Sequence, residues 1–402
     1  MALWLGQLIS FIGDYFNYLA IPITINQLTG SAGMVGLSFI ANALPALLFG
    51  PIAGVFVDRL DRRRVMIASD LLRGLLVLCL LTIHDKNQIW VFYLVGFLVS
   101  CTSQFFFPAR GAVLPLIVAN PDDWLAANGM MQVIQTVGLL AGPAMAGYAI
   151  GLWGPRAAFI ANSVGYFCSA VAVISLRVPG AGPAAAQSGS TVRGVIADLK
   201  EGMRYLFGNR NMVGVMVCMS VANLGLGAVN VIWVPYMQRV FGVDARGLGI
   251  VDSAQGAGMV VGALLLGVAA SRFRKIFMAS GGMILISVLI SAWGLANTFP
   301  LVILISVLVG LFLVPLQSAL STIQQMEVPN LKRGRVGSSM NALTTLASLA
   351  SMAFASLLGE VLGLRNIFFI VGAFAGASGI LGFILLREPV KPAQELPVEG
   401  EG

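Results

Sequence analysis

An aspartate lies near the middle of the first long apolar run of the chain. Asp14 is the one charged residue between Met1 and Asn26, in the stretch that reads Ser-Phe-Ile-Gly-Asp-Tyr-Phe-Asn-Tyr. A buried carboxyl group without a neighbouring cation can load and release a proton near neutral pH, and its ionised form binds cations. A structural contact that fixes the first segment is the alternative. We expect Asp14 to couple protons or bind substrate.

A second acid lies in a later apolar run. Asp252 stands three residues before Gln255, but only about six residues into its segment, so a partly solvated helix end is the alternative. Uncharged groups at similar depth complete the candidate set for proton coupling and substrate binding: Asp14, Asn17, Gln104, Asn223, Trp233, Asp252 and Gln255. A cavity with few fixed charges among many apolar groups suits a bulky amphipathic ligand.

Other charged residues have spacings typical of structural contacts. Asp70 and Arg73 lie three apart, which permits an ion pair on one helix face, with Arg110 or the segment around Asp58 as further partners. Glu327 ends an apolar run just before a basic cluster, which indicates a gate or a helix cap. Glu360 ends another run and is expected to be solvated.

The chain offers no cluster suited to enzymatic or ATP-driven chemistry. Its one histidine, His84, sits in a short polar connection, and its four cysteines lie in apolar runs without paired spacing. A phosphate-binding glycine loop is missing from the sequence. We therefore expect no metal, no cofactor and no enzymatic activity.

The elements that position these residues must lie in a membrane. Hydrophobic residues make up 58% of the 402 residues and charged residues only 10%, whereas soluble chains carry about 25% charged residues. A water-soluble enzyme, a disordered chain and a disulfide scaffold are excluded. We predict an all-α polytopic membrane protein with twelve spans of about 20 residues or more, at 3–27, 33–57, 65–83, 89–108, 125–150, 156–176, 210–236, 247–270, 276–297, 300–325, 336–360 and 366–386.

The distribution of lysine and arginine predicts the orientation. Of 24 such residues, 18 fall in one set of alternate connections, 5 in the other set, and Arg73 within a span. Cytoplasmic connections are the basic ones, so both termini are expected in the cytoplasm and the protein in the plasma (inner) membrane. We attribute the net positive charge to the orientation of the chain in the membrane, and no nucleic-acid partner is expected.

A polar linker divides the spans six and six. Its first part is rich in Pro, Gly, Ala and Ser, and its second part has the pattern of an amphipathic helix at the membrane surface. The basic segment that starts at Gly54 has a degenerate counterpart that starts at Gly267, in the same place of each half, which favours an internal repeat. We expect a six-helix bundle at 1–176, a cytoplasmic linker at 177–209, a second bundle at 210–387 and a cytoplasmic tail at 388–402.

One motif carries a family resemblance. The sequence Gly54-x-x-x-Asp58-Arg59-x-x-Arg62-Arg63 resembles the signature between spans two and three of the major facilitator superfamily, with Asp61 where that family usually has glycine. A carboxylate at one helix end can bind the N-terminus of a neighbouring helix, and the arginines can reach the other half. In the family this signature steadies the outward-open state. The resemblance implies a conformational gate made of Gly54, Asp58, Arg59, Arg62, Arg63, Asp70, Arg73, Arg110, Glu327 and Arg335.

A second motif lies in span five. Gly138-x-x-x-Gly142-Pro143-x-x-x-Gly147 resembles the antiporter signature of drug-exporting members, and its small residues permit close helix approach. The stretch from Phe105 to Leu116, together with Ala127-Asn128 and Arg333-Gly334-Arg335-Val336, is similar to the macrolide efflux and enterobactin exporter branch.

The resemblance spans the chain and implies two pseudo-symmetric six-helix bundles acting by alternating access. It implies a proton-coupled exporter, of the drug:proton antiporter type, for a hydrophobic drug, a macrolide-like or a siderophore-like molecule. The expected partners are this substrate, protons and the bilayer, and the working unit is expected to be a monomer. An importer or a lysophospholipid flippase of the same fold remains an alternative, as does a non-transporting membrane receptor.

Overall fold

Long apolar helices make up the chain in the computed structural model, which describes residues 2–57, 59–118, 123–176, 178, 192–269 and 273–387. A helix satisfies its own backbone hydrogen bonds, as a chain in lipid requires, and twelve helices in these ranges are long and apolar enough to cross a membrane. The helices are α1 (Ala2–Thr29), α2 (Ala32–Val57), α3 (Arg62–Leu78), α4 (Trp90–Ile117), α5 (Trp124–Trp153), α6 (Pro155–Ser175), α7 (Val192–Gly208), α8 (Arg210–Phe241), α9 (Ala245–Ala269), α10 (Gly282–Leu295), α11 (Phe299–Glu327), α12 (Arg333–Leu362) and α13 (Leu364–Leu385).

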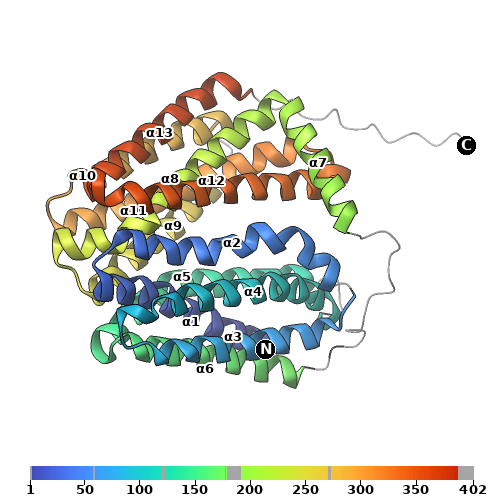
Figure 1. Ribbon diagram of the computed structural model, residues 1–402. Helices are drawn as coiled ribbons and strands as arrows, with labels where there is room; N and C mark the ends of the chain where they lie inside the picture. Colours follow the sequence, from blue (N-terminus) through green and yellow to red (C-terminus); the bar gives the residue numbers. More distant parts are fainter. Residues whose placement is uncertain are drawn as a thin grey trace, which may run out of the picture.

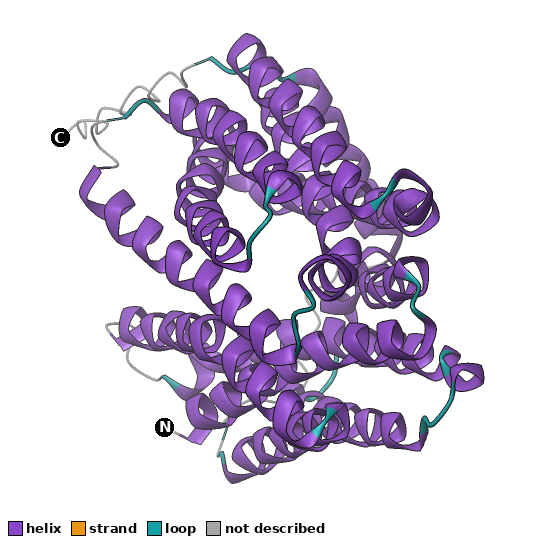
Figure 2. Ribbon diagram, turned by 90° about the vertical axis from the view of Figure 1, so that its left-hand side faces the viewer, coloured by secondary structure: helices purple, strands orange, loops and turns teal. Residues whose placement is uncertain are grey.

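The helices form two bundles of six, with α7 outside both. Helices α1–α6, blue to green in Figure 1, make one half, and α8–α13, green to red, make the other. The predicted all-α fold with two six-helix bundles is confirmed, and the turned view shows only helices and their connections in the described ranges (Figure 2). In each half, related helices pair: α1 with α6 and α2 with α4, and likewise α8 with α13 and α9 with α11.

The two ends of the bundle differ. We call the end that carries α7 and the 328–332 connection the linker end, and the opposite end, with the turns between α1 and α2 and between α8 and α9, the far end (Figure 1). Four far-end turns contain a glycine with positive φ, a conformation that other residues rarely adopt: Gly30 and Gly154 in one half, Gly242 and Gly363 in the other. The turns α1–α2 and α8–α9 hold equivalent places in their halves, as do α5–α6 and α12–α13, so the repeat extends to the backbone of the turns.

The predicted spans agree with the helices to within a few residues except at the seventh, where α8 continues past 236 to Phe241, and at the fourth. Its end was expected at Pro108, but α4 continues through Pro108 and Pro115 to Ile117, because neighbouring helices can compensate for the backbone bond that a proline removes. The expected amphipathic helix is present as α7. Of the rest of the predicted linker, 177 and 179–191 lie outside the described residues, as do the tail at 388–402 and Asp58.

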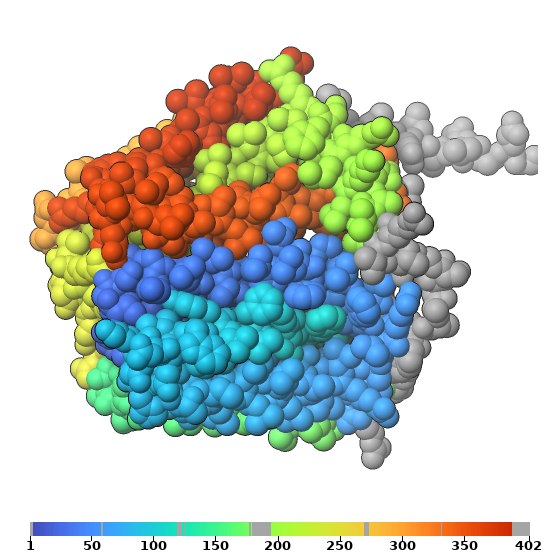
Figure 3. Space-filling view, viewed as in Figure 1, coloured from blue at the N-terminus to red at the C-terminus, as the bar shows by residue number. Residues whose placement is uncertain are grey.

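The halves touch along α2–α12 and α5–α9, and the first of these seams runs across the face in Figure 3. At the far end the contacts involve backbone: a Cβ added to Gly33 would lie 2.7 Å from the Ser356 carbonyl oxygen, and one added to Gly249 would lie 2.3 Å from the Pro143 carbonyl oxygen. At the linker end of the same helices, a Cβ on Gly54 or Gly129 would meet nothing within 4 Å. The structure is therefore packed tightly across the halves at the far end and more openly at the linker end.

Candidate functional site

A central space with two lobes lies between the halves. The lobe on the α1–α6 side, called the N lobe, has a volume of about 590 Å³, and the lobe on the α8–α13 side, called the C lobe, about 440 Å³. Both are lined by Tyr15 and Tyr18 of α1 and by Asn230 of α8. Each lobe has a size typical of small-molecule sites, about 300–1,000 Å³.

The predicted polar residues divide between the lobes. Asp14, Asn17 and Gln104 line the N lobe, whereas Trp233, Asp252 and Gln255 line the C lobe. Asn223 does not join them: it lies outside the lining of both lobes, and its side-chain amide donates to the Met219 carbonyl one turn back on its own helix. A polar group in a span can be satisfied in this way by its own backbone.

Asp14 belongs to a polar network that crosses the first bundle. Tyr166 donates a hydrogen bond of 2.6 Å to its carboxylate. The guanidinium of Arg73 stacks on the Tyr166 ring at 4.5 Å and on the Phe106 ring at 4.2 Å, and it forms the expected ion pair with Asp70. Both members of this pair are almost fully buried, so the loss of either partner would leave an uncompensated buried charge and destabilise the fold.

The network continues to Arg110 through two uncharged side chains. Ser169 donates to Asp70 at 2.7 Å and accepts from Gln7 at 3.1 Å, and Gln7 accepts from Arg110 at 2.9 Å. Arg110, Arg73 and Asp14 line one small chamber of about 60 Å³. Arg110 is thus a more distant partner of the Asp70–Arg73 pair, linked to it through Gln7 and Ser169.

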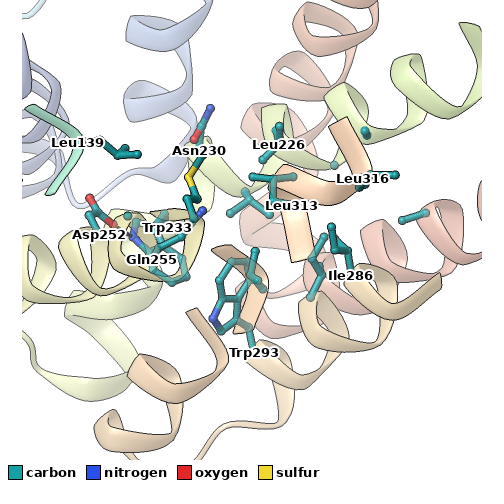
Figure 4. Close-up of a pocket in the computed structure, with 18 of the residues that line it drawn as sticks. Leu139, Leu226, Asn230, Trp233, Asp252, Gln255, Ile286, Trp293, Leu313 and Leu316 are labelled. Carbon is teal, nitrogen blue, oxygen red and sulfur yellow. Dashed lines mark hydrogen bonds between the residues drawn. The ribbon is translucent and has the colours of Figure 1, made fainter. Parts of the chain in front are cut away.

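The C lobe is mostly apolar, with its polar groups on one side. Trp233 donates from its indole nitrogen to Asp252 at 3.1 Å. Figure 4 shows Asp252, Gln255 and Asn230 on one side of the pocket and Leu313, Leu316 and Ile286 on the other. The Trp293 ring lies against Trp233, with ring centroids 4.9 Å apart.

Sequence reasoning missed three tyrosines of this site. Tyr18 donates to Asn230 of the other half at 3.3 Å, Tyr15 lines both lobes, and Tyr166 holds Asp14. Tyr18 follows Asp14 by four residues, which places both on one helix face, so that spacing was an available signal. Tyr166 had none, because it comes from another helix.

Among the arginines after α2, Arg63 binds within its own half. The side chain of Arg63 donates to the Val173 carbonyl at 3.3 Å and also to the Ile174 carbonyl, at the end of α6, where carbonyls have no helical partner. We expected a latch across to the other half; the halves pack openly at this end, so Arg63 binds the nearest free carbonyls instead. Arg59 follows Gly54 and α2 in the connection, and Arg62 begins α3.

The departure from the family motif at position 61 has a local cause. The Asp61 side chain accepts the backbone N–H of Arg64 at 3.0 Å and so caps the N-terminus of α3. A glycine would leave this N–H without its side-chain acceptor. The aspartate therefore stabilises the start of the helix that carries Asp70 and Arg73.

Glu327 and Arg335 fix helix α7 and the start of α8. Glu327 accepts from Asn209 at 3.2 Å and from Asn211. Arg335 of α12 pairs with Asp198 at 2.7 Å and with Glu201, both on α7. Both residues thus make contacts within the second half and its attached helix.

The glycines of the span-five motif face two neighbours. A Cβ on Gly138 would lie 2.3 Å from the Phe11 ring, and one on Gly142 would lie 2.4 Å from the Tyr15 ring. The lack of a side chain at these two glycines therefore lets α1 pack closely against α5. A Cβ on Gly147 would lie 2.4 Å from the Ala245 carbonyl oxygen, so this glycine admits α9 of the other half. Pro143 lies between them and lines the C lobe.

Glu360 is exposed, as expected, and it also joins the halves at the far end. Its carboxylate accepts the backbone N–H of Ala32, at the start of α2, at 2.8 Å, and it pairs with Arg239 at 3.4 Å. Arg239 also donates to the Gly30 carbonyl. The exposed end of α12 therefore also contacts the other half, where the N-terminus of α2 attracts the carboxylate, whereas Arg239 comes from α8 of the same half.

Two of the relatives that the chain matches along most of its length are named as efflux proteins. The chain is 25% identical over 376 residues to macrolide efflux protein A of Streptococcus pyogenes, covering 92% of this chain and 91% of that protein. It is 25% identical over 392 residues to the multidrug efflux pump Tap of Mycobacterium tuberculosis, covering 95% and 93%.

Solved structures and a family model agree on the fold. A bacterial homologue of the human lysosomal transporter Spinster, in an inward-facing and unoccupied conformation, superposes with a TM-score of 0.76 at 16% identity, covering 98% of each chain. A bacterial homologue of the iron transporter ferroportin, also inward-facing, superposes with a TM-score of 0.76 at 15% identity, covering 96% of this chain and 97% of that one. The family model described as Major Facilitator Superfamily matches residues 3–225 and 215–401. With twelve spans, a repeated six-helix bundle and this match along its length, the chain belongs to the major facilitator superfamily.

Proposed function

We propose that this protein exports a bulky amphipathic small molecule in exchange for protons, by alternating access between its two halves. The observation that carries the proposal is the central space, which both halves line and which holds acids at membrane depth, Asp14 and Asp252. Acids in that position are expensive in a membrane and suit proton relay. The efflux relatives and the span-five glycine motif favour export over import.

The far-end contacts support a gating cycle. Closure there depends on Gly147 against α9 and on Glu360 against α2. In the opposite state these contacts open, and the arginines after α2 together with the α11–α12 connection close the linker end. The buried Asp70–Arg73 pair holds α3 rigid through this change.

The linker end is proposed to face the cytoplasm of the plasma (inner) membrane, with both chain termini on that side. The 18 of 24 cations assigned to one set of connections support this orientation. A monomer is the proposed working unit, because one chain supplies both walls of the central space.

Inside-out membrane vesicles test the proposal. With the lumen acidified by respiration, vesicles that contain the protein should accumulate radiolabelled erythromycin, a macrolide chosen because of the named relatives. Nigericin, which collapses the pH gradient, should abolish the accumulation. Accumulation that survives nigericin, or that equals vesicles without the protein, would contradict proton-driven export of macrolides.

An importer or a lysophospholipid flippase of the same fold predicts other results. An importer would move erythromycin out of these vesicles, and a flippase would act on a fluorescent lysolipid without accumulating erythromycin. A non-transporting receptor would bind ligand without any gradient-dependent flux.

A further inference from the structure

The two lobes of the central space have opposite electrostatic surroundings. On the N side, Asp14 and Asp70 face two cations, Arg73 and Arg110, within one connected network. Two negative and two positive charges balance there. Asp14 therefore has its counter-charges already, supplied by the protein.

Asp252 has no such balance. Trp233 is its one hydrogen-bond donor among the described residues, and the C-lobe lining in that part of the chain contains no lysine, arginine or histidine. The titratable groups that face it are Tyr15 and Tyr18 of α1. Its neighbouring helices α5, α10 and α11 present apolar side chains to the lobe, namely Leu139, Pro143, Met283, Ile286, Ile290, Trp293, Val309, Leu313 and Leu316.

A lone carboxylate in such a cavity is costly to keep ionised. It must take up either a proton or a cation from outside the protein. Of the two acids that line the lobes, Asp252 is thus the one whose charge must be neutralised by a proton or a cation from outside the protein.

The walls around Asp252 suit an organic cation. Trp233 and Trp293 pack together with their ring centroids 4.9 Å apart, and Tyr15 and Tyr18 line the same lobe. Aromatic faces attract ammonium groups through their quadrupole. The apolar side formed by Ile286, Leu313 and Leu316 (Figure 4) can hold the rest of the molecule.

We propose that Asp252 is the cation-recognition residue of this transporter. It binds the ammonium group of a lipophilic amine or quaternary ammonium compound, and a proton takes the place of that group when the substrate leaves. Asp14 is then a charge-balanced structural acid of the N bundle. This inference rests on the proposed export function, because it assigns the substrate class and the exchange point of the same site.

The test compares two ions of the same shape and opposite charge. Radiolabelled tetraphenylphosphonium and tetraphenylborate are bound at equilibrium to purified protein in nanodiscs of neutral lipid, with no gradient. The wild type should bind the cation at least about tenfold more tightly than the anion. Asp252→Asn should lose this preference.

A relocated charge separates recognition from folding. The double variant Asp252→Asn/Gln255→Glu restores an acid to the same lobe, one helical turn away, and should recover preference for the cation. Asp123→Asn removes an equal charge from an exposed residue at the start of α5 that makes no side-chain cap bond, and should bind like the wild type. Lowering the pH from 8 to 5 should weaken cation binding in the wild type but not in Asp252→Asn.

Several results would overturn the proposal: unchanged cation preference in monodisperse Asp252→Asn, equal binding of both ions by the wild type, or loss without recovery in the double variant. Because binding is measured without a gradient, these results leave proton-driven export standing. Conversely, cation selectivity in a protein that fails the vesicle assay would refute export alone.

Discussion

An added methyl group at Gly147 should push the far end open. The Cβ of an alanine there would lie 2.4 Å from the Ala245 carbonyl oxygen and 3.0 Å from the Cα of Gly249. Carbon atoms pack at about 3.5–4.0 Å, so α5 and α9 must separate by roughly 1 Å at this point. Both contacts are backbone, so no side chain can rotate out of the way.

The cost should appear as a change in population. Overpacking of this kind costs about 1–3 kcal/mol, which corresponds to a shift of about 5- to 150-fold toward the state with the far end open. Spin labels at Leu152 and Val361, which are 60% and 80% exposed near the far ends of α5 and α12, report that state as a longer distance in double electron–electron resonance. The four cysteines of the chain are replaced beforehand.

Gly129→Ala is the matched control. It lies on the same helix, gains the same helix propensity, and its Cβ would meet nothing within 4 Å. It should leave the distance distribution of the wild type unchanged. If Gly147→Ala also gives the wild-type distribution, closure at the far end does not depend on this contact and the reasoning is wrong.

Three further changes probe other parts of the molecule. Asp70→Asn removes the carboxylate that pairs with the buried Arg73, which should cost about 3–5 kcal/mol and lower the unfolding temperature in detergent; an unchanged temperature would show that the pair is not structural. Glu360→Ala removes the carboxylate that joins the halves and should lengthen the far-end distance, whereas Glu360→Gln keeps an acceptor and should do less; equal effects would count against this contact. Burial, and then the charge of Glu327, raise the pKa of Tyr205, whose neutral hydroxyl donates to the Glu327 carbonyl. Docking of α7 should therefore persist below about pH 10 and weaken as the pH rises through the raised pKa; hydrogen exchange of α7 that shows the same pH step in Tyr205→Phe would refute this origin.

Local sequence patterns predicted the fold well. Twelve apolar runs of sufficient length require twelve spans, because a polypeptide in lipid has few other ways to satisfy its backbone. The Asp70–Arg73 pair was predictable for the same reason: its spacing of three lies within one helix. The end of α4 was predicted too early because proline disrupts a membrane helix less than it disrupts a helix in water.

Contacts between distant helices could not be predicted in this way. Tyr166 reaches Asp14 from another helix, and Glu360 finds its partner on the other half. The charge around Asp14 and around Asp252 likewise depends on side chains from several helices, which no local pattern contains.

The most direct test of the central claim measures protons and substrate together. Liposomes containing the purified protein enclose the pH indicator pyranine, and radiolabelled erythromycin is added outside with no imposed gradient. For an exchanger, inward movement of erythromycin must drive protons outward, so the lumen should become alkaline as the label enters, and a protonophore should abolish the pH change. Entry of erythromycin with an unchanged or acidified lumen would contradict proton antiport.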